Sequence, residues 1–205
     1  MKLTIELMKR LSLYLFLLLF TFQAPSLADD IKDFQIEGIS VGDNLLDHAE
    51  ILDVTREFIL NKKFKFYQKS NRLGLLRFAN RGTFQIYDGV QFTADPKNYK
   101  IYTISGIIDI KSKSECINKQ KEIIEELSKV AVSAKKEIED FYPHSADDTG
   151  ESIANGVYLD FASGDTLSVE CYLWGKKFKE KGYDDNLKVN IETKEGRDFI
   201  QNEAY

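Results

Sequence analysis

Residues 112–141 read SKSECINKQKEIIEELSKVAVSAKKEIEDF, and this stretch decides the predicted fold. Ser112 and Glu115 have the spacing of a capping box, in which two side chains satisfy free backbone N–H groups at a helix start. Apolar residues then recur at steps of three, four and seven, while the other face carries Lys and Glu. The pattern predicts one long amphipathic helix that runs to Phe141 and is ended by Pro143.

The segments around this helix alternate apolar and polar residues, as half-buried strands do. Residues 62–110 are predicted to form an antiparallel meander, and two short helices are expected between residues 43 and 60. The strands predicted after the long helix are Val157–Phe161, Thr166–Trp174 and Leu187–Ile191, with a short helix from Lys194. The fold class is therefore α+β: a mostly antiparallel sheet with one long amphipathic helix packed on one face and short N-terminal helices.

The two cysteines of the chain support this arrangement. Cys116 lies in the first turn of the long helix, and Cys171 lies on the core side of its strand. A disulfide bond between them would join the helix to the sheet and stabilise the fold by roughly 3–4 kcal/mol. The alternative is two buried free thiols.

The N-terminus has the features of a cleavable secretory signal. Lys2, Lys9 and Arg10 precede an apolar run, residues 11–20, and small side chains at Ser26 and Ala28 fit a cleavage site before residue 29. The alternative is a membrane anchor, but the run spans roughly 18 Å as a helix, against a hydrocarbon core of about 30 Å. We therefore expect a signal peptide at residues 1–28 and a single exported domain at residues 29–205, periplasmic or secreted.

The charge of the exported part limits its partners. Removing residues 1–28 takes away three basic residues and Glu6, so the balance of 28 basic to 33 acidic residues becomes 25 to 32, a net charge of −7. This acidity argues against general nucleic-acid binding, which needs a positive field. No further transmembrane helix is expected, because no later apolar run approaches about 18 residues.

The opening residues 29–43, DDIKDFQIEGISVGD, together with the signal-like end, resemble a group of small uncharacterised exported proteins of Gram-negative bacteria. The stretch from Tyr99 through Ile110 to Cys116 is similar to a pattern of several periplasmic α+β modules. The resemblance implies a compartment and a shape. It implies no activity, ligand residue or cofactor.

No known catalytic or cofactor motif is present in the sequence. The two histidines, His48 and His144, lack metal-ligand spacing, and neither a phosphate loop nor a Gly-x-Ser-x-Gly elbow occurs. His144, Asp147, Asp148 and Glu151 cluster in one loop, which could bind a divalent cation through oxygen ligands, but the spacing is not that of a calcium loop and a solvated polar loop is favoured. We therefore expect no cofactor, no metal site and no identifiable catalytic residue.

One segment departs from the acidic character of the chain. Residues 61–81 contain no Asp or Glu, but they contain seven basic residues interleaved with aromatic ones: Lys62, Lys63, Lys65, Lys69, Arg72, Arg77 and Arg81. As a hairpin, the segment would present a basic outer surface to an anionic ligand. The alternative is an edge strand whose lysines prevent aggregation between sheets.

These observations predict a binding or interaction module of the cell envelope, with an envelope component or another exported protein as its partner. One mode of binding is an anionic ligand on residues 62–81, but edge protection is the favoured explanation of these basic residues. An envelope hydrolase with an unrecognised site is the alternative. A structural role would need an exposed apolar patch, for which Phe92, Tyr172 and Trp174 are candidates.

Overall fold

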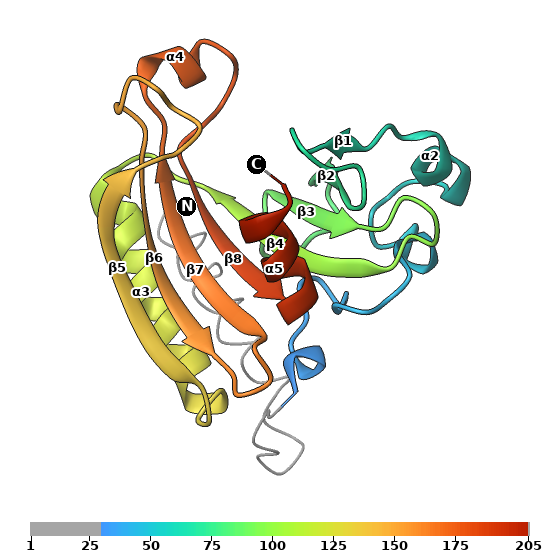
Figure 1. Cartoon of the computed structure of the whole chain (residues 1–205), viewed down its shortest axis with the longest axis horizontal. Helices are drawn as coiled ribbons and strands as arrows, with labels where there is room; N and C mark the ends of the chain where they lie inside the picture. Colours follow the sequence, from blue (N-terminus) through green and yellow to red (C-terminus); the bar gives the residue numbers. More distant parts are fainter. Residues whose placement is uncertain (1–29, 205) are drawn as a thin grey trace, which may run out of the picture.

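An eight-stranded antiparallel sheet forms the centre of the protein, as the computed structural model of residues 30–204 shows (Figure 1). The strands are β1 (Lys65–Phe66), β2 (Gly74–Ala79), β3 (Gly89–Ala94), β4 (Ile101–Asp109), β5 (Lys135–Pro143), β6 (Ile153–Asp160), β7 (Thr166–Leu173) and β8 (Asn186–Glu192). Their order is β1-β2-β3-β4-β8-β7-β6-β5, so two meanders join where β4 pairs with β8. The predicted α+β class and mostly antiparallel sheet are confirmed. The proposed signal peptide, residues 1–28, lies outside the described residues.

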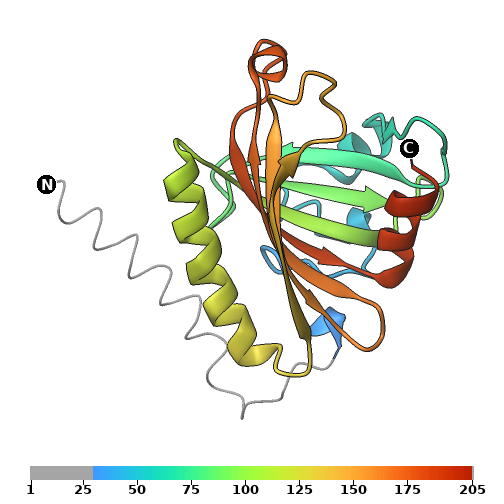
Figure 2. The ribbon, with the colours of Figure 1, turned by 60° about the vertical axis from the view of Figure 1, so that its left-hand side comes forward.

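Helices cover both faces of the sheet. They are η1 (Ile31–Asp33), η2 (Leu45–His48), α2 (Arg56–Asn61), α3 (Lys113–Val130), α4 (Lys176–Lys179) and α5 (Lys194–Asn202). Helix α3 packs against β6, β7 and β8, whereas α5 lies on the opposite face against β4 (Figure 2). Within residues 30–204, no helix is long and apolar enough to cross a membrane.

The start of α3 is fixed by its cap. The Ser112 hydroxyl accepts a hydrogen bond from the Glu115 N–H at 3.1 Å. The Glu115 carboxylate accepts one from the Lys111 N–H at 3.0 Å. Both contacts satisfy backbone donors that have no partner within the helix.

The end of α3 differs from the prediction. The helix stops at Val130, and residues 135–143 form β5, so the predicted extension to Phe141 is wrong. Ile138 lies opposite Val157 of β6, and Pro143 ends the edge strand rather than a helix. Apolar residues keep a helical spacing through this segment. Pairing with β6, however, satisfies the backbone N–H and C=O groups that a helix would pair internally, and the segment therefore forms a strand.

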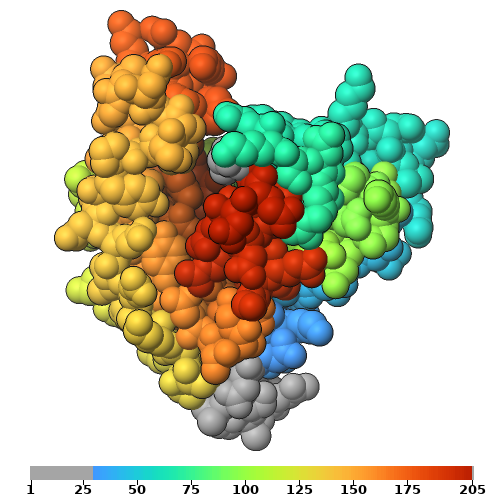
Figure 3. Space-filling model, in the orientation of Figure 1, coloured from blue at the N-terminus to red at the C-terminus, as the bar shows by residue number. Residues whose placement is uncertain are grey.

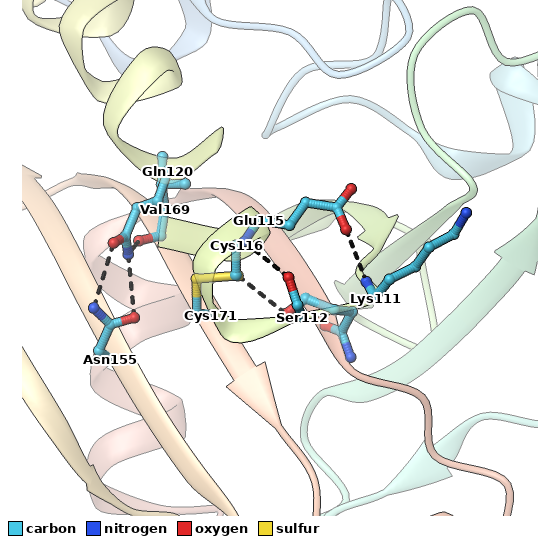
Figure 4. The surroundings of a disulfide bond; sticks show 9 residues. Lys111, Ser112, Glu115, Cys116, Gln120, Asn155, Val169 and Cys171 are labelled. Atoms are coloured by element: carbon cyan, nitrogen blue, oxygen red, sulfur yellow. Dashed lines mark hydrogen bonds between the residues drawn. A yellow bond between two sulfur atoms is a disulfide. The ribbon is translucent and has the colours of Figure 1, made fainter. Parts of the chain in front are cut away.

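A disulfide bond joins α3 to the sheet (Figure 4). The sulfur atoms of Cys116 and Cys171 are 2.07 Å apart, which confirms the predicted pairing. One turn further along α3, the Gln120 amide donates to the Val169 carbonyl at 2.7 Å and faces the amide of Asn155. The buried Gln120 amide therefore has partners on two neighbouring strands, β6 and β7.

The main core lies on the α3 face of the sheet. Helix α3 covers the β6–β8 part, and buried residues of the segment 31–59 cover β2–β4. Phe92 of β3 is fully buried in this core, so the hypothesis that it belongs to an exposed apolar patch is wrong. The side chain of Glu37 ties the N-terminal segment to the sheet by accepting hydrogen bonds from three successive backbone N–H groups: Gln85, Ile86 and Tyr87.

Removal of the disulfide bond tests its contribution. Changing Cys116 and Cys171 together to Ala should lower the free energy of unfolding by about 4 kcal/mol, because the bond closes a loop with a sequence separation of 55 residues. Urea unfolding of the oxidised wild type and of the double variant measures the difference. A reductant should destabilise the wild type only, and equal stability of the two proteins would contradict the prediction.

Candidate binding cleft

The sheet face opposite α3 is polar, although it is largely covered. Strand register places one polar row across four neighbouring strands: Gln91, Ser105, Asn190 and Ser168. Successive residues of a strand point to opposite faces, so this row lies on the face opposite the core residues that alternate with it. A cleft of about 460 Å³ lies over the row.

The walls of the cleft come from several elements. β5 and β6 form one side and α5 the other, with the hollow between them visible between the yellow-orange and red surfaces in Figure 3. A Cβ at Gly196 would lie 2.7 Å from Thr103 Cγ2 and 2.9 Å from the Tyr102 carbonyl oxygen. Glycine at this position therefore allows α5 to approach β4 closely. Arg197 of α5 reaches across the sheet to Asp160 and Thr166, with N–O distances of 2.6 and 2.5 Å.

The β7 side of the cleft floor is internally satisfied. Glu170 is only 8% exposed, and its carboxylate accepts hydrogen bonds from three side chains. The donors are the Ser168 hydroxyl at 2.7 Å, the Asn190 amide at 2.7 Å and the Tyr172 hydroxyl at 2.5 Å. Three donors on one carboxylate hold it in a fixed position, so this part of the floor is rigid.

On the β4 and β8 side of the floor, by contrast, several polar groups have no hydrogen bond or ion pair within the described residues. Thr103 and Ser105 are each 6% exposed and line the cleft, but their hydroxyls make no hydrogen bond to any residue in 30–204. The carboxylate of Glu192, directly opposite Thr103, also has neither a hydrogen bond nor an ion pair with the described part of the chain. Lys188 lies over the Tyr172 ring, with Nζ 4.7 Å from its centre. Its ammonium group forms no ion pair within the described residues.

Burial shifts the pKa values of both charged groups. The pKa of Glu192 is raised to about 7, mainly by burial and to a smaller extent by the nearby charge of Glu170. Burial lowers the pKa of Lys188, although the charge of Glu170 opposes this effect. Glu192 therefore changes its charge near neutral pH, which is unusual for a carboxyl group.

Aromatic rings form the end of the cleft near α4. His144 contacts Tyr172 and Trp174, with ring centres 5.7 and 4.9 Å apart. Trp174 stacks further on Phe178 at 5.1 Å. Burial lowers the pKa of His144, and the neighbouring Lys188 charge adds to this effect. Tyr172 and Trp174, which were candidates for an exposed patch, are half-buried and line the cleft instead.

The basic segment proposed as an anion site does not gather in one place. Arg72 pairs with Glu195 and Glu203 at 3.0 and 2.9 Å, which anchors the loop before β2 to α5. Lys62 and Arg81 lie over the Phe58 ring, at 5.4 and 5.9 Å. The remaining predicted residues are exposed: Lys63, Lys65, Lys69 and Arg77. β1 is an edge strand, the position that the alternative role of these lysines requires.

Arg77 does not line the cleft, but it neighbours residues that do. It lies opposite Gln91, and its charge acts on Lys188. A second hollow of about 500 Å³ is lined by Lys62, Arg77, Phe78 and Arg81 among others. The anion site thus stays a prediction, with its best-placed residues at this hollow.

The carboxylates of the acidic loop after β5 form hydrogen bonds and ion pairs within the loop and with α4. Asp147 accepts hydrogen bonds from the backbone and hydroxyl groups of Thr149 and Ser152, and these contacts lower its pKa. Asp148 pairs with Lys177, and Glu151 accepts from the Lys176 N–H. Among the described residues, no group of three potential ligands is placed to hold a metal ion.

The cleft residues were not identified from the sequence, although a signal for them exists. Polar and charged residues alternate with core residues in three strand segments that read TISG, SVECY and LKVNIE. One polar residue on an outer strand face is ordinary, but Glu170, Lys188 and Glu192 together place three charges on central strands. The missing information was the pairing of β4 with β8, which brings these segments together.

The charge of Glu192 can be tested through stability. With a pKa raised from 4.5 to about 7, folded wild type binds this proton more tightly than the unfolded chain, so its stability falls as pH rises between these values. Glu192→Gln removes this loss. The stability of the variant relative to wild type should increase by about 3 kcal/mol from pH 4.5 to pH 8 in urea unfolding.

Glu125→Gln is the matched control, because Glu125 is exposed on α3. This variant should follow wild type at every pH. A stability difference between Glu192→Gln and wild type that is independent of pH would contradict the prediction.

Comparisons with known proteins identified no similar protein. The chain matches no protein-family model, and searches of curated proteins and of solved structures gave no significant match. The resemblance of residues 29–43 to exported proteins therefore transfers no site residue to the cleft. The assignment of a function depends on the geometry described above.

Proposed function

We propose that this protein is a binding module whose ligand, a small polar molecule, occupies the cleft on the sheet face opposite α3. One observation carries the proposal: Thr103 and Ser105 are more than nine-tenths buried, and their hydroxyls, which border the cleft, have no hydrogen-bond partner among residues 30–204. These hydroxyls are therefore free to bind a ligand. A hydrogen bond of this kind contributes about 0.5–1.5 kcal/mol.

The size and shape of the cleft agree with this role. Its volume of about 460 Å³ lies within the range of small-molecule sites, roughly 300–1,000 Å³. The satisfied Glu170 network gives the floor a fixed shape, and the half-buried Tyr158, Tyr172 and Trp174 supply apolar contact area. Such a preformed site loses little conformational entropy when a ligand binds.

Export is part of the same proposal. The Cys116–Cys171 disulfide bond is compatible with an oxidising compartment, such as the periplasm or the exterior of the cell. The ligand would then be a component of the envelope or its surroundings. An anionic partner on the basic segment is a separate proposal, to be tested with variants of Lys62 and Arg81.

A hydrolase is the second candidate, and one observation favours it. Glu192, with a pKa of about 7, has the property of a general acid or base at neutral pH. An activated serine is not found in the described chain: Ser168 donates to Glu170, and His144 Nδ1 accepts from the Ala146 N–H. Hydrolysis of chromogenic esters or glycosides that is lost in Glu192→Gln would support this candidate over simple binding.

Changing Thr103 to Val and Ser105 to Ala tests the binding proposal. Ligand-observed NMR with a library of sugars, amines and amino acids should give hits with wild type that the double variant loses. Because no hydrogen bond is removed, the free double variant should be as stable as wild type or more stable by about 1 kcal/mol.

Thr83→Val with Ser133→Ala is the control, since both residues are exposed. This pair should keep every hit. Hits that persist in the Thr103/Ser105 variant, or a complete absence of hits, would show that the cleft is not the binding site.

A further inference from the structure

The charges around the cleft are unequal, and this imbalance indicates the chemistry of its ligand. Five carboxylates line the cleft, against two cationic side chains: Glu137, Glu139, Asp160, Glu170 and Glu192, with Lys188 and Arg197. Arg197 is paired with Asp160 at 2.6 Å. Lys188 lies directly opposite Glu170 in the register of β7 and β8. Lys188 forms no ion pair within the described residues, but five carboxylates against two cationic side chains still leave the excess charge negative.

The excess charge is centred on Glu192. Of the two floor carboxylates, Glu170 and Glu192, only Glu192 has no hydrogen bond or ion pair within the described chain, and it lines the cleft together with the hydroxyls of Thr103 and Ser105. Thr103 is its direct neighbour on β4, and Ser105 is two residues further along the same face. Directly opposed side chains in an antiparallel pair have Cβ atoms about 4.5–5.5 Å apart. One small group can therefore contact Glu192 and Thr103 together.

These three free groups form a set of acceptors. A carboxylate accepts only, and a threonine or serine hydroxyl has two lone pairs to offer. A primary ammonium group carries three N–H donors and one positive charge, which matches three acceptors of which one is negative. A phosphate or carboxylate ligand would face Glu192 with a like charge, and a neutral hydroxyl would leave that charge unbalanced.

We propose that the cleft binds a small molecule with a primary ammonium group, which donates hydrogen bonds to Glu192, Thr103 and Ser105. This inference depends on the proposed function and specifies its ligand class. The ammonium lies over the pairing of β4 with β8, and the rest of the molecule extends toward Tyr172 and Trp174. Glu137 and Glu139 on the β5 wall add to the attraction of a cation.

The pH dependence follows from the groups that face Glu192. They are Glu170 of β7, Arg197 of α5, Lys188 of β8 and Asp160 of β6. Together with burial, these groups give Glu192 a pKa of about 7. An ammonium ligand requires the ionised carboxylate, so its affinity should decrease by about tenfold from pH 8 to pH 6.

The test compares 1,5-diaminopentane with its neutral isostere, 1,5-pentanediol, by NMR titration of the full chain. The diamine should bind at least tenfold more tightly than the diol at pH 8. Glu192→Gln should weaken diamine binding by tenfold or more and abolish the pH dependence, whereas Glu125→Gln should change neither. Retained folding of Glu192→Gln is checked by its unfolding curve, and Ser105→Ala, which keeps the charge, should weaken binding to a smaller extent.

The outcomes separate this inference from the proposed function. Equal binding of diamine and diol, or diamine binding that is unchanged in Glu192→Gln, would overturn the ammonium assignment. If other library hits then still depend on Thr103 and Ser105, the cleft remains a binding site for another class of ligand. If no hit depends on these residues, both proposals fail.

Discussion

The pairing of β4 with β8 is the constraint on which the rest of the molecule depends. It joins two antiparallel meanders into one sheet, with Thr103 opposite Glu192 and Asp109 opposite Asn186. On one face, this seam brings Ile104 next to Ile191 in the main core. On the other face, it forms the cleft floor. The same seven residue pairs therefore contribute to both the core and the cleft floor, and a shift of one residue in this register would exchange the two faces.

The two faces of the central strands bury different kinds of side chain. The α3 face buries aliphatic side chains and fixes its helix with a disulfide bond and the Gln120 contacts. The cleft face buries charges, and it satisfies them only in part: Glu170 has three donors, whereas Glu192 has no hydrogen bond within the described chain. Unsatisfied charge in a covered position lowers stability. Its concentration at one end of the floor supports the proposal that this face binds a ligand, because an apolar or smaller side chain would stabilise the fold better.

Much of the fold could be predicted from the sequence, whereas the site could not. Hairpins such as β6–β7 and the Cys116–Cys171 bond follow from alternation and from local turn residues. The boundary between α3 and β5 did not, because residues 131–141 fit a helical period and their strand state is set by pairing with β6. A bulge near Ala94 also places Tyr102 in the cluster around Phe199, whereas Ile104 lies in the main core, so simple alternation along β4 does not give the face of Tyr102. The cleft needs a pairing between residues that are 77 to 89 positions apart in the sequence, from Asp109–Asn186 to Thr103–Glu192, which no local pattern encodes.

This long separation also affects how the protein folds. Each meander has mostly local contacts, so each can form early, but the seam requires a large loop closure before its contacts are made. β8 (Asn186–Glu192) is the last strand in the sheet of the described residues. A chain that is still being synthesised therefore lacks the floor of the cleft until β8 has been added. A ligand of the proposed site would stabilise only the complete sheet, by mass action on the step that closes the seam.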